Sequence, residues 1–163
     1  MNLSAAQDKF ICDWGKLCTN WGVKKAMGQI HALLLVSKDD LCADEVMEKL
    51  CMSRGNVNMN LRELEHWNLI QKVYKTGNRK DFYRAEKDLS KVFKIIVEER
   101  KKKELDPLLR LLEEVNSVKA GCPDSNEFCQ MTKDLHRFAK RADQALNTII
   151  GSNKDWISKI LLR

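Results

Sequence analysis

The side chains whose types and spacing suggest a chemical function gather in residues 53–67, which we call the candidate recognition helix. Ser53 is a favourable helix N-cap, and the residues after it follow a helical period. At about 100° per residue, one side of this helix is apolar and is expected to face a core. That side consists of Val57, Leu61, Leu64 and Trp67. The opposite side carries amide and guanidinium donors, which are the groups that recognise the edges of DNA bases.

The polar side of the candidate recognition helix offers several kinds of DNA contact. Asparagine can pair with adenine and Arg62 with guanine, while Gly55 would let the helix approach the duplex closely. Met59 could contact a thymine methyl group, and Arg54 is expected to anchor a phosphate. Three asparagines lower helix propensity, so helix stability alone does not account for them, although Asn60 beside the apolar side is expected to be structural. The predicted DNA-binding residues here are Ser53, Arg54, Gly55, Asn56, Asn58, Met59 and Arg62.

A β-hairpin is predicted directly after this helix. Residues 69–75 and 81–85 have strand-like patterns, and the turn between them contains Gly77 and Asn78. Residues 53–85 hold seven basic and three acidic side chains, a local excess of four positive charges. A solvated hairpin without DNA contact is the alternative interpretation of the basic turn. The basic residues expected to contact phosphates or an adjacent minor groove are Lys75, Arg79 and Lys80.

Helices are also predicted on the N-terminal side. Residues 3–20 have apolar positions at steps of three and four, and a second, more apolar helix covers residues 26–34. His31 in that second helix is expected to lie in the core or at its boundary, with its polar atoms satisfied. After the short extended pair Leu41–Cys42, Asp44 is expected to cap a helix of about two turns. This helix and the candidate recognition helix meet across a short turn, which is the arrangement of a helix-turn-helix.

Beyond residue 87 the sequence predicts further helices. A charged run at residues 98–104 follows the first apolar face, and Asp106–Pro107 is expected to break or restart the helix, because proline fits only the first turn. Residues 105–115 then carry a heptad-like stripe of leucine and valine.

The last part of the chain is predicted to hold a loop and a second striped helix. Residues 121–127 are assigned to the loop, and Asp124 and Glu127 have capping-box spacing for the helix after it. A short tail helix around Trp156 is also predicted. Stripes of this extent favour a homodimer, whereas packing onto the winged helix is the alternative. The apolar residues of the last stripe are Leu135, Phe138, Ala142, Ala145 and Ile149.

These elements predict a mainly α-helical winged helix-turn-helix, in which three helices and a β-hairpin wing are flanked by helices at both ends. Residues 21–86 are expected to form the DNA-binding domain. Residues 1–20 are expected to contribute an N-terminal helix to a dimerisation region, and residues 87–163 to form the rest of that region. Seven glycines and two prolines among 163 residues agree with long helices rather than a sheet-rich fold.

The amino-acid composition is typical of a globular protein and is rich in basic residues. A net charge of +6 suits a polyanionic partner, although charge alone does not establish one. No apolar run reaches the roughly 18 residues of a membrane span and the N-terminus has no signal-peptide pattern, so a cytoplasmic protein without a membrane partner is expected. The six cysteines form no C-x-x-C pair and the three histidines are scattered, so neither a metal nor a cofactor is expected. The thiols are expected to be reduced, with Cys122 and Cys129 the first pair to test for a redox role.

Two motifs carry a resemblance to a known family. The stretch from Met52 to Leu64 and the run from Gly77 to Tyr83 closely resemble the GbsR-like branch of the MarR-type winged-helix regulators, and Trp21-Gly22 resembles it too. The similarity is strongest over residues 21–86, whereas the C-terminal helices match only in pattern. The resemblance implies a homodimer that binds palindromic operator DNA near promoters, usually as a repressor.

The sequence therefore predicts a sequence-specific double-stranded DNA-binding transcription regulator, expected to be a homodimeric repressor. A winged helix used as a protein-interaction module without DNA binding is the alternative, because this fold does not by itself imply DNA. No glycine-rich phosphate loop, metal cluster or catalytic histidine arrangement favours an enzyme. A small-molecule effector of unidentified chemistry is compatible with the family, whose namesake branch is associated with choline-type ligands. No ligand site is assigned, since Trp14 and Trp67 lie on apolar helix faces.

Overall fold

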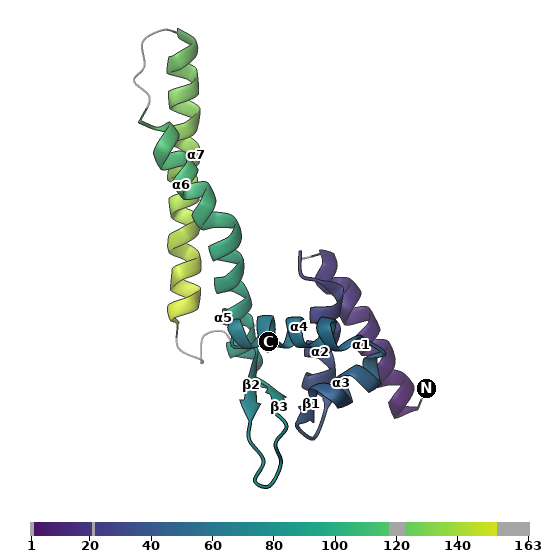
Figure 1. Ribbon diagram of the computed structural model, residues 1–163. Coiled ribbons are helices and arrows are strands. Elements are labelled where there is room, and N and C mark those ends of the chain that lie inside the picture. Colours follow the sequence, from purple (N-terminus) through teal and green to yellow (C-terminus); the bar gives the residue numbers. More distant parts are fainter. Residues whose placement is uncertain (1, 21, 118–122, 153–163) are drawn as a thin grey trace. The chain divides into compact units, whose positions relative to one another are not determined.

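The computed structural model describes residues 2–20, 22–117 and 123–152, which are mainly helical and include a small sheet, as predicted (Figure 1). The chain divides into two compact units, residues 1–92 and 93–163. The chain starts with α1 (Leu3–Asn20), α2 (Lys25–Val36), β1 (Leu41–Cys42), α3 (Ala43–Leu50), α4 (Arg54–His66), β2 (Ile70–Val73) and β3 (Phe82–Ala85). It continues with α5 (Leu89–Arg100), the π-helical segment η1 (Lys101–Leu105), α6 (Asp106–Val115) and α7 (Pro123–Gly151).

The sheet of the first unit has three antiparallel strands in the order β1-β3-β2. β2 and β3 form the predicted hairpin, with Val73 opposite Phe82, and the loop between them projects beyond the sheet (Figure 1). The extended pair Leu41–Cys42 is also confirmed. The structure adds that this pair is a third strand, because Leu41 lies opposite Tyr83 and Cys42 opposite Phe82. The hairpin is thereby joined to the segment that precedes α3.

α2 is the central helix of the first unit and packs against α1, α3, α4 and β3. Its apolar residues are buried, and Ile30 is completely inaccessible to solvent. α1 approaches α2 closely where glycine removes a side chain, since a Cβ atom on Gly28 would lie 2.8 Å from the Sγ atom of Cys18. The residues of α1 that are buried are Ile11, Gly15 and Cys18, whereas Phe10 and Leu17 are 40% and 48% exposed.

His31 is a buried titratable residue on α2, with only 4% of its surface exposed. The predicted core position is confirmed. The expectation that its polar atoms all form hydrogen bonds is wrong, because the Nε2 atom has no partner among the described residues. Burial lowers the pKa of the imidazole from 6.5 to about 4, since the charged form loses its hydration. His31 is therefore neutral at pH 7.

We expect the neutral state of His31 to make the fold sensitive to acid. The unfolded chain takes up a proton near pH 6.5 and the folded chain only near pH 4, so folding stability falls as the pH is lowered between these values. The slope should approach about 1.4 kcal/mol per pH unit. Urea denaturation at several pH values measures it, and His31→Leu should remove this component of the slope. An unchanged slope in His31→Leu would show that another group causes the acid sensitivity.

The start of α3 differs from the prediction. Asp44 was expected to be its N-cap, but the helix begins at Ala43 and Cys42 occupies the cap position. The carboxylate of Glu45 accepts a hydrogen bond of 2.7 Å from the backbone N–H of Cys42 and closes a capping box. Asp44 is thus within the first turn, and its carboxylate is available for contacts outside the helix.

The predicted break or restart at Asp106–Pro107 is observed as a restart, because α6 begins at Asp106 directly after η1. The backbone remains helical there, with Pro107 in the first turn of α6, the part of a helix that accepts proline. The change occurs before the proline, because Lys101–Leu105 adopts the wider π-helical hydrogen bonding. The helix restarts without an intervening loop.

The predicted loop at residues 121–127 is wrong from Pro123 onward, because α7 already begins at that residue. Asp124 therefore lies inside the helix and is not its N-cap. Trp21, Cys122 and the predicted tail helix around Trp156 lie outside the described residues.

α7 carries two heptad stripes that face different surroundings. The inner stripe includes Cys129 and Ala139, both buried, and faces α6 and η1, which lie alongside α7 (Figure 1). Polar contacts interrupt this interface, since Lys101 Nζ lies 2.9 Å from the Asp143 carboxylate. The outer stripe is apolar and 42–71% exposed at its large residues. Those large residues are Phe128, Met131, Leu135 and Phe138.

Candidate nucleic-acid interface

The candidate recognition helix is observed as α4, with the predicted bounds. Ser53 is its N-cap, and the hydroxyl Oγ accepts a hydrogen bond of 3.4 Å from the backbone N–H of Asn56. Trp67 is the C-cap. The predicted core side is confirmed, because Val57, Leu61, Leu64 and Trp67 are all buried. Because this side of α4 is buried in the core, the opposite side of the helix faces outward.

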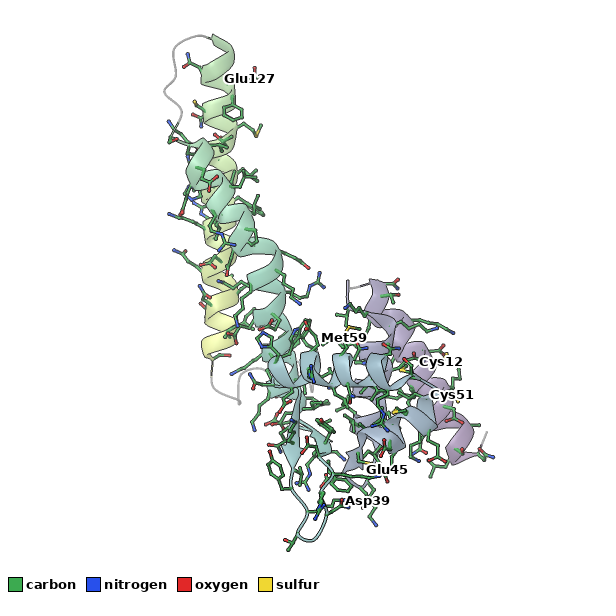
Figure 2. All side chains as sticks on the ribbon, viewed as in Figure 1. Cys12, Asp39, Glu45, Cys51, Met59 and Glu127 are labelled. Carbon is green, nitrogen blue, oxygen red and sulfur yellow. The ribbon has the colours of Figure 1, made fainter. Side chains whose placement is uncertain are left out.

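The outward side of α4 presents a mixed surface for contact with a ligand. Gly55, Met59 and Arg62 are exposed, whereas Asn58 is half-buried. Figure 2 marks the position of Met59 on α4. No protein atom lies within 4 Å of the place where a Cβ atom of Gly55 would be. Arg62 forms no ion pair with another described residue, so its guanidinium is available to an external acceptor.

Asn60 and Asn56 interact within α4. Asn60 is 2% exposed, and its side-chain amide donates 2.8 Å hydrogen bonds to both the backbone oxygen and the Oδ1 atom of Asn56. The structural role predicted for Asn60 is therefore confirmed. Asn56, predicted to contact a base, is half-buried and already uses its carboxamide oxygen inside the protein. Its amide donor makes no hydrogen bond to another described residue and is the group best placed for DNA.

We expect Asn60→Ala to lower the free energy of unfolding by roughly 1–3 kcal/mol, because a buried side chain and its hydrogen bonds are lost together. Asn58→Ala is the matched control, since Asn58 is half-buried on the other side of the same helix. Its effect should stay within about 0.5 kcal/mol. Urea denaturation of both variants gives the comparison, and equal losses would contradict the structural role of Asn60.

The loop between β2 and β3 has the geometry of a wing tip. Gly77 has a φ of +80°, which favours glycine, and the backbone N–H of Asn78 donates to the Lys75 oxygen at 3.0 Å. The side chain of Asn78 accepts a hydrogen bond from the backbone N–H of Lys80. Arg79 is exposed and forms no ion pair with another described residue. The predicted turn is therefore observed, with basic side chains on it.

Lys75 lies at the base of the wing rather than at its tip. Its Nζ atom is 4.0 Å from the centre of the Phe82 ring, a cation–π contact, and 3.4 Å from the backbone oxygen of Asp40. Arg84 on β3 makes a two-pronged contact to the Asp40 carboxylate at 2.6 and 2.8 Å. The hydrogen bond from Arg84 holds the pKa of Asp40 below its ordinary value. These contacts fasten the wing to the segment before β1.

Asp44 joins the candidate recognition helix to the wing. Its carboxylate accepts hydrogen bonds from Arg54 at 3.0 Å and from Lys80 at 2.7 Å. From the sequence, Arg54 and Lys80 are expected to contact phosphates separately, and Asp44 is expected to cap a helix. The structure brings the three together beside a shallow hollow, which is lined also by Asn58 and Tyr83. No local sequence signal indicates this cluster, because its partners come from three separate elements.

Neither a metal site nor a membrane span is found in the described part of the chain. Residues 2–20, 22–117 and 123–152 contain no group of three or more histidine, cysteine or acidic side chains that could hold a metal ion. None of the helices formed by these residues is long and apolar enough to cross a bilayer. The thiols of Cys12, Cys18, Cys42 and Cys51 are free, and Cys51 lies in the turn between α3 and α4 (Figure 2).

Comparison with known proteins connects this arrangement to transcription regulators. No family model matches the chain. It is 26% identical over 91 residues to the HTH-type transcriptional repressor GbsR of Bacillus subtilis (strain 168), covering 56% of this chain and 50% of GbsR. It is also 26% identical over 73 residues to the HTH-type transcriptional repressor OpcR of the same organism, covering 45% and 40%. The chain thus spans about half or less of the length of these curated relatives.

A solved structure supports the fold independently. A crystal structure of a transcriptional regulator matches with a TM-score of 0.69 at 14% sequence identity, covering 90% of this chain and 96% of that chain. The predicted winged helix-turn-helix fold is therefore confirmed. The names of the relatives also agree with the prediction of a transcription regulator. By sequence and fold together, the chain is a distant homologue of GbsR-like HTH-type transcriptional regulators, as the motifs in its recognition helix and wing predict.

Proposed function

We propose that this protein is a sequence-specific double-stranded DNA-binding transcription regulator that acts as a repressor. The observation that carries the proposal is the outward side of α4, where exposed Arg62 and half-buried Asn58 lie on a helix that is followed by a basic wing. Winged helices recognise DNA by placing one helix in the major groove, while basic residues contact the phosphates of the DNA backbone on either side. The names of GbsR and OpcR as repressors support the sign of regulation.

The residues divide into two groups under this proposal. Base contacts come from the outward side of α4, with Asn58 and Arg62 as hydrogen-bonding groups, Met59 as an apolar contact and Gly55 as the point of close approach. Phosphate contacts position the helix on the duplex, and they come from α4 and from the wing. The phosphate-contacting residues are Arg54, Lys75, Arg79 and Lys80.

We further propose that the protein binds palindromic operators as a homodimer, in the cytoplasm. Support comes from the outer stripe of α7, whose large apolar residues have heptad spacing and remain exposed in the single chain. Residues 21–86 would form the DNA-binding domain, while residues 1–20 and 87–163 would contribute to dimerisation. Two recognition helices related by a two-fold axis would occupy half-sites about one helical turn apart. An effector, if one acts, binds a site that is still to be identified.

Selection of bound fragments from genomic DNA tests the proposal and names targets at the same time. The purified protein should enrich a recurring inverted repeat whose half-sites are about one helical turn apart. A parallel selection with a protein heated past its unfolding transition controls for retention by charge alone. Failure to enrich any shared sequence, in a selection where a known repressor succeeds, would favour a winged helix that binds a protein instead.

A further inference from the structure

Asp44 places a negative charge within the surface that the proposed function assigns to DNA phosphates. Its Oδ1 atom accepts from Arg54 Nη2 and its Oδ2 atom from Lys80 Nζ, at 3.0 and 2.7 Å. Arg54 is the first residue of α4, and Lys80 follows the turn of the wing. All three side chains are well exposed to solvent. A single carboxylate therefore occupies a position between two cations that a duplex could also reach.

Arg54 and Lys80 could bind an external anion, but in the free protein they bind the carboxylate of Asp44. An arginine and a lysine at hydrogen-bonding distance from one acidic group are the donors that commonly hold a phosphate oxygen. The hydrogen bond from Lys80, with a smaller contribution from Arg54, holds the pKa of Asp44 below its ordinary range, and Asp44 in turn raises the pKa of Lys80. The ion pairs therefore persist at neutral pH in the free protein.

We propose that Asp44 is an internal competitor for a DNA phosphate, which holds Arg54 and Lys80 in the free protein and is displaced from them when a duplex binds. The inference rests on the proposed DNA-binding function. Exposed ion pairs are weak because water screens them, so a phosphate can take over the two donors. Once it does, the carboxylate faces a like charge. Asp44 thus lowers the affinity for DNA of any sequence.

Asp44→Asn tests the inference, because it removes the negative charge and keeps the size of the side chain. The probe is a mixed-sequence duplex, titrated by fluorescence anisotropy at several salt concentrations. Affinity at low salt should rise roughly threefold to tenfold, although two ion pairs are lost. The slope of log affinity against log salt should steepen by about one unit per protomer, since the variant gains one net positive charge toward the phosphates.

Asp13→Asn is the matched control. Asp13 on α1 also lies between two cations, Lys9 at 2.5 Å and Lys16 at 2.9 Å, and its replacement changes the net charge by the same amount. Its affinity and salt slope should remain close to those of the wild type. The double variant Asp44→Asn with Lys80→Met should lose most of the gain, because the freed donor is then absent.

Three results would overturn the inference. Unchanged or weaker binding by Asp44→Asn would mean that the carboxylate only positions its partners. An equal gain in Asp13→Asn would assign the effect to net charge rather than to the cluster. Absence of any duplex binding by the wild type at low salt would overturn the proposed function itself, an outcome that the wild-type titration separates from the other two.

Discussion

Replacing Arg62 and Arg79 together by alanine is expected to lower the affinity for a selected operator on the order of 100-fold to 1,000-fold. Arg62 is exposed on the outward side of α4 and Arg79 on the wing, and neither forms an ion pair with another described residue. A bidentate arginine–guanine contact contributes about 1–3 kcal/mol of discrimination, and loss of a phosphate contact adds to it. Anisotropy titrations of the wild type and the variant provide the measurement.

The two single variants separate base contacts from backbone contacts. Arg62→Ala should reduce the preference for the operator over a mixed-sequence duplex, whereas Arg79→Ala should weaken both duplexes alike and lower the salt slope by about one per protomer. Arg110→Ala with Arg141→Ala is the matched control, since it removes two exposed arginines from the second unit. Equal losses in this control would assign the effect to overall charge and contradict the proposed interface.

Phe138→Asp should convert the proposed dimer to a monomer at micromolar concentration. Phe138 is 71% exposed in the single chain and belongs to the outer stripe of α7. A carboxylate at the centre of an apolar helix interface would have to be buried without a partner, which is strongly unfavourable. Because two half-sites are then no longer bound together, operator affinity should fall by about 100-fold or more. Light scattering gives the mass, and anisotropy gives the affinity.

Gln144→Asp is the control for the oligomeric state. It adds the same charge to α7 at an exposed position that belongs to neither stripe, so it should leave both the mass and the operator affinity unchanged. The interpretation of the outer stripe would be wrong if Phe138→Asp remained a dimer, or if the wild type were a monomer at micromolar concentration.

Elements with a strong local signal could be predicted from the sequence. The bounds of α4 follow from the Ser53 cap and a regular apolar period, and the wing follows from two short strands around Gly77-Asn78. The roles of Leu61 and Asn60 follow from their angle around the same helix. In each case the determining interactions lie within a few residues of one another, so a single stretch of sequence contains them.

Features that depend on distant partners could not be predicted. Aspartate is favoured at helix N-caps, so the sequence predicts that Asp44 caps α3. Only the folded structure shows that Cys42 occupies the cap position and that the Asp44 carboxylate contacts Arg54 and Lys80. Likewise, the extended conformation of Leu41–Cys42 could be predicted, but its pairing with β3, about 40 residues later in the chain, could not. The difference in free energy between one N-cap residue and another is smaller than the contribution of such tertiary contacts, so the tertiary contacts decide the conformation.

The helical stripes were identified from the sequence, but not the surfaces they face. Leu135 and Phe138 were recognised as one stripe, while the inner stripe around Ala139 is interrupted by Thr132, His136 and Asp143 and has no continuous apolar signal. The partly exposed ion pair between Lys101 and Asp143 takes the place of apolar packing at part of this interface. The apolar stripe is therefore the exposed one, which strengthens the proposal that a second copy covers it.

The salt dependence of duplex binding by the wild-type protein tests the central claim most directly. Four phosphate-contacting cations per protomer predict that log affinity falls linearly with log salt, with a slope between about −5 and −7 for a dimer, and that a selected operator binds at least about 1,000-fold more tightly than a mixed-sequence duplex. Absence of binding at low salt, or equal affinity for the two duplexes, would contradict a sequence-specific DNA-binding regulator.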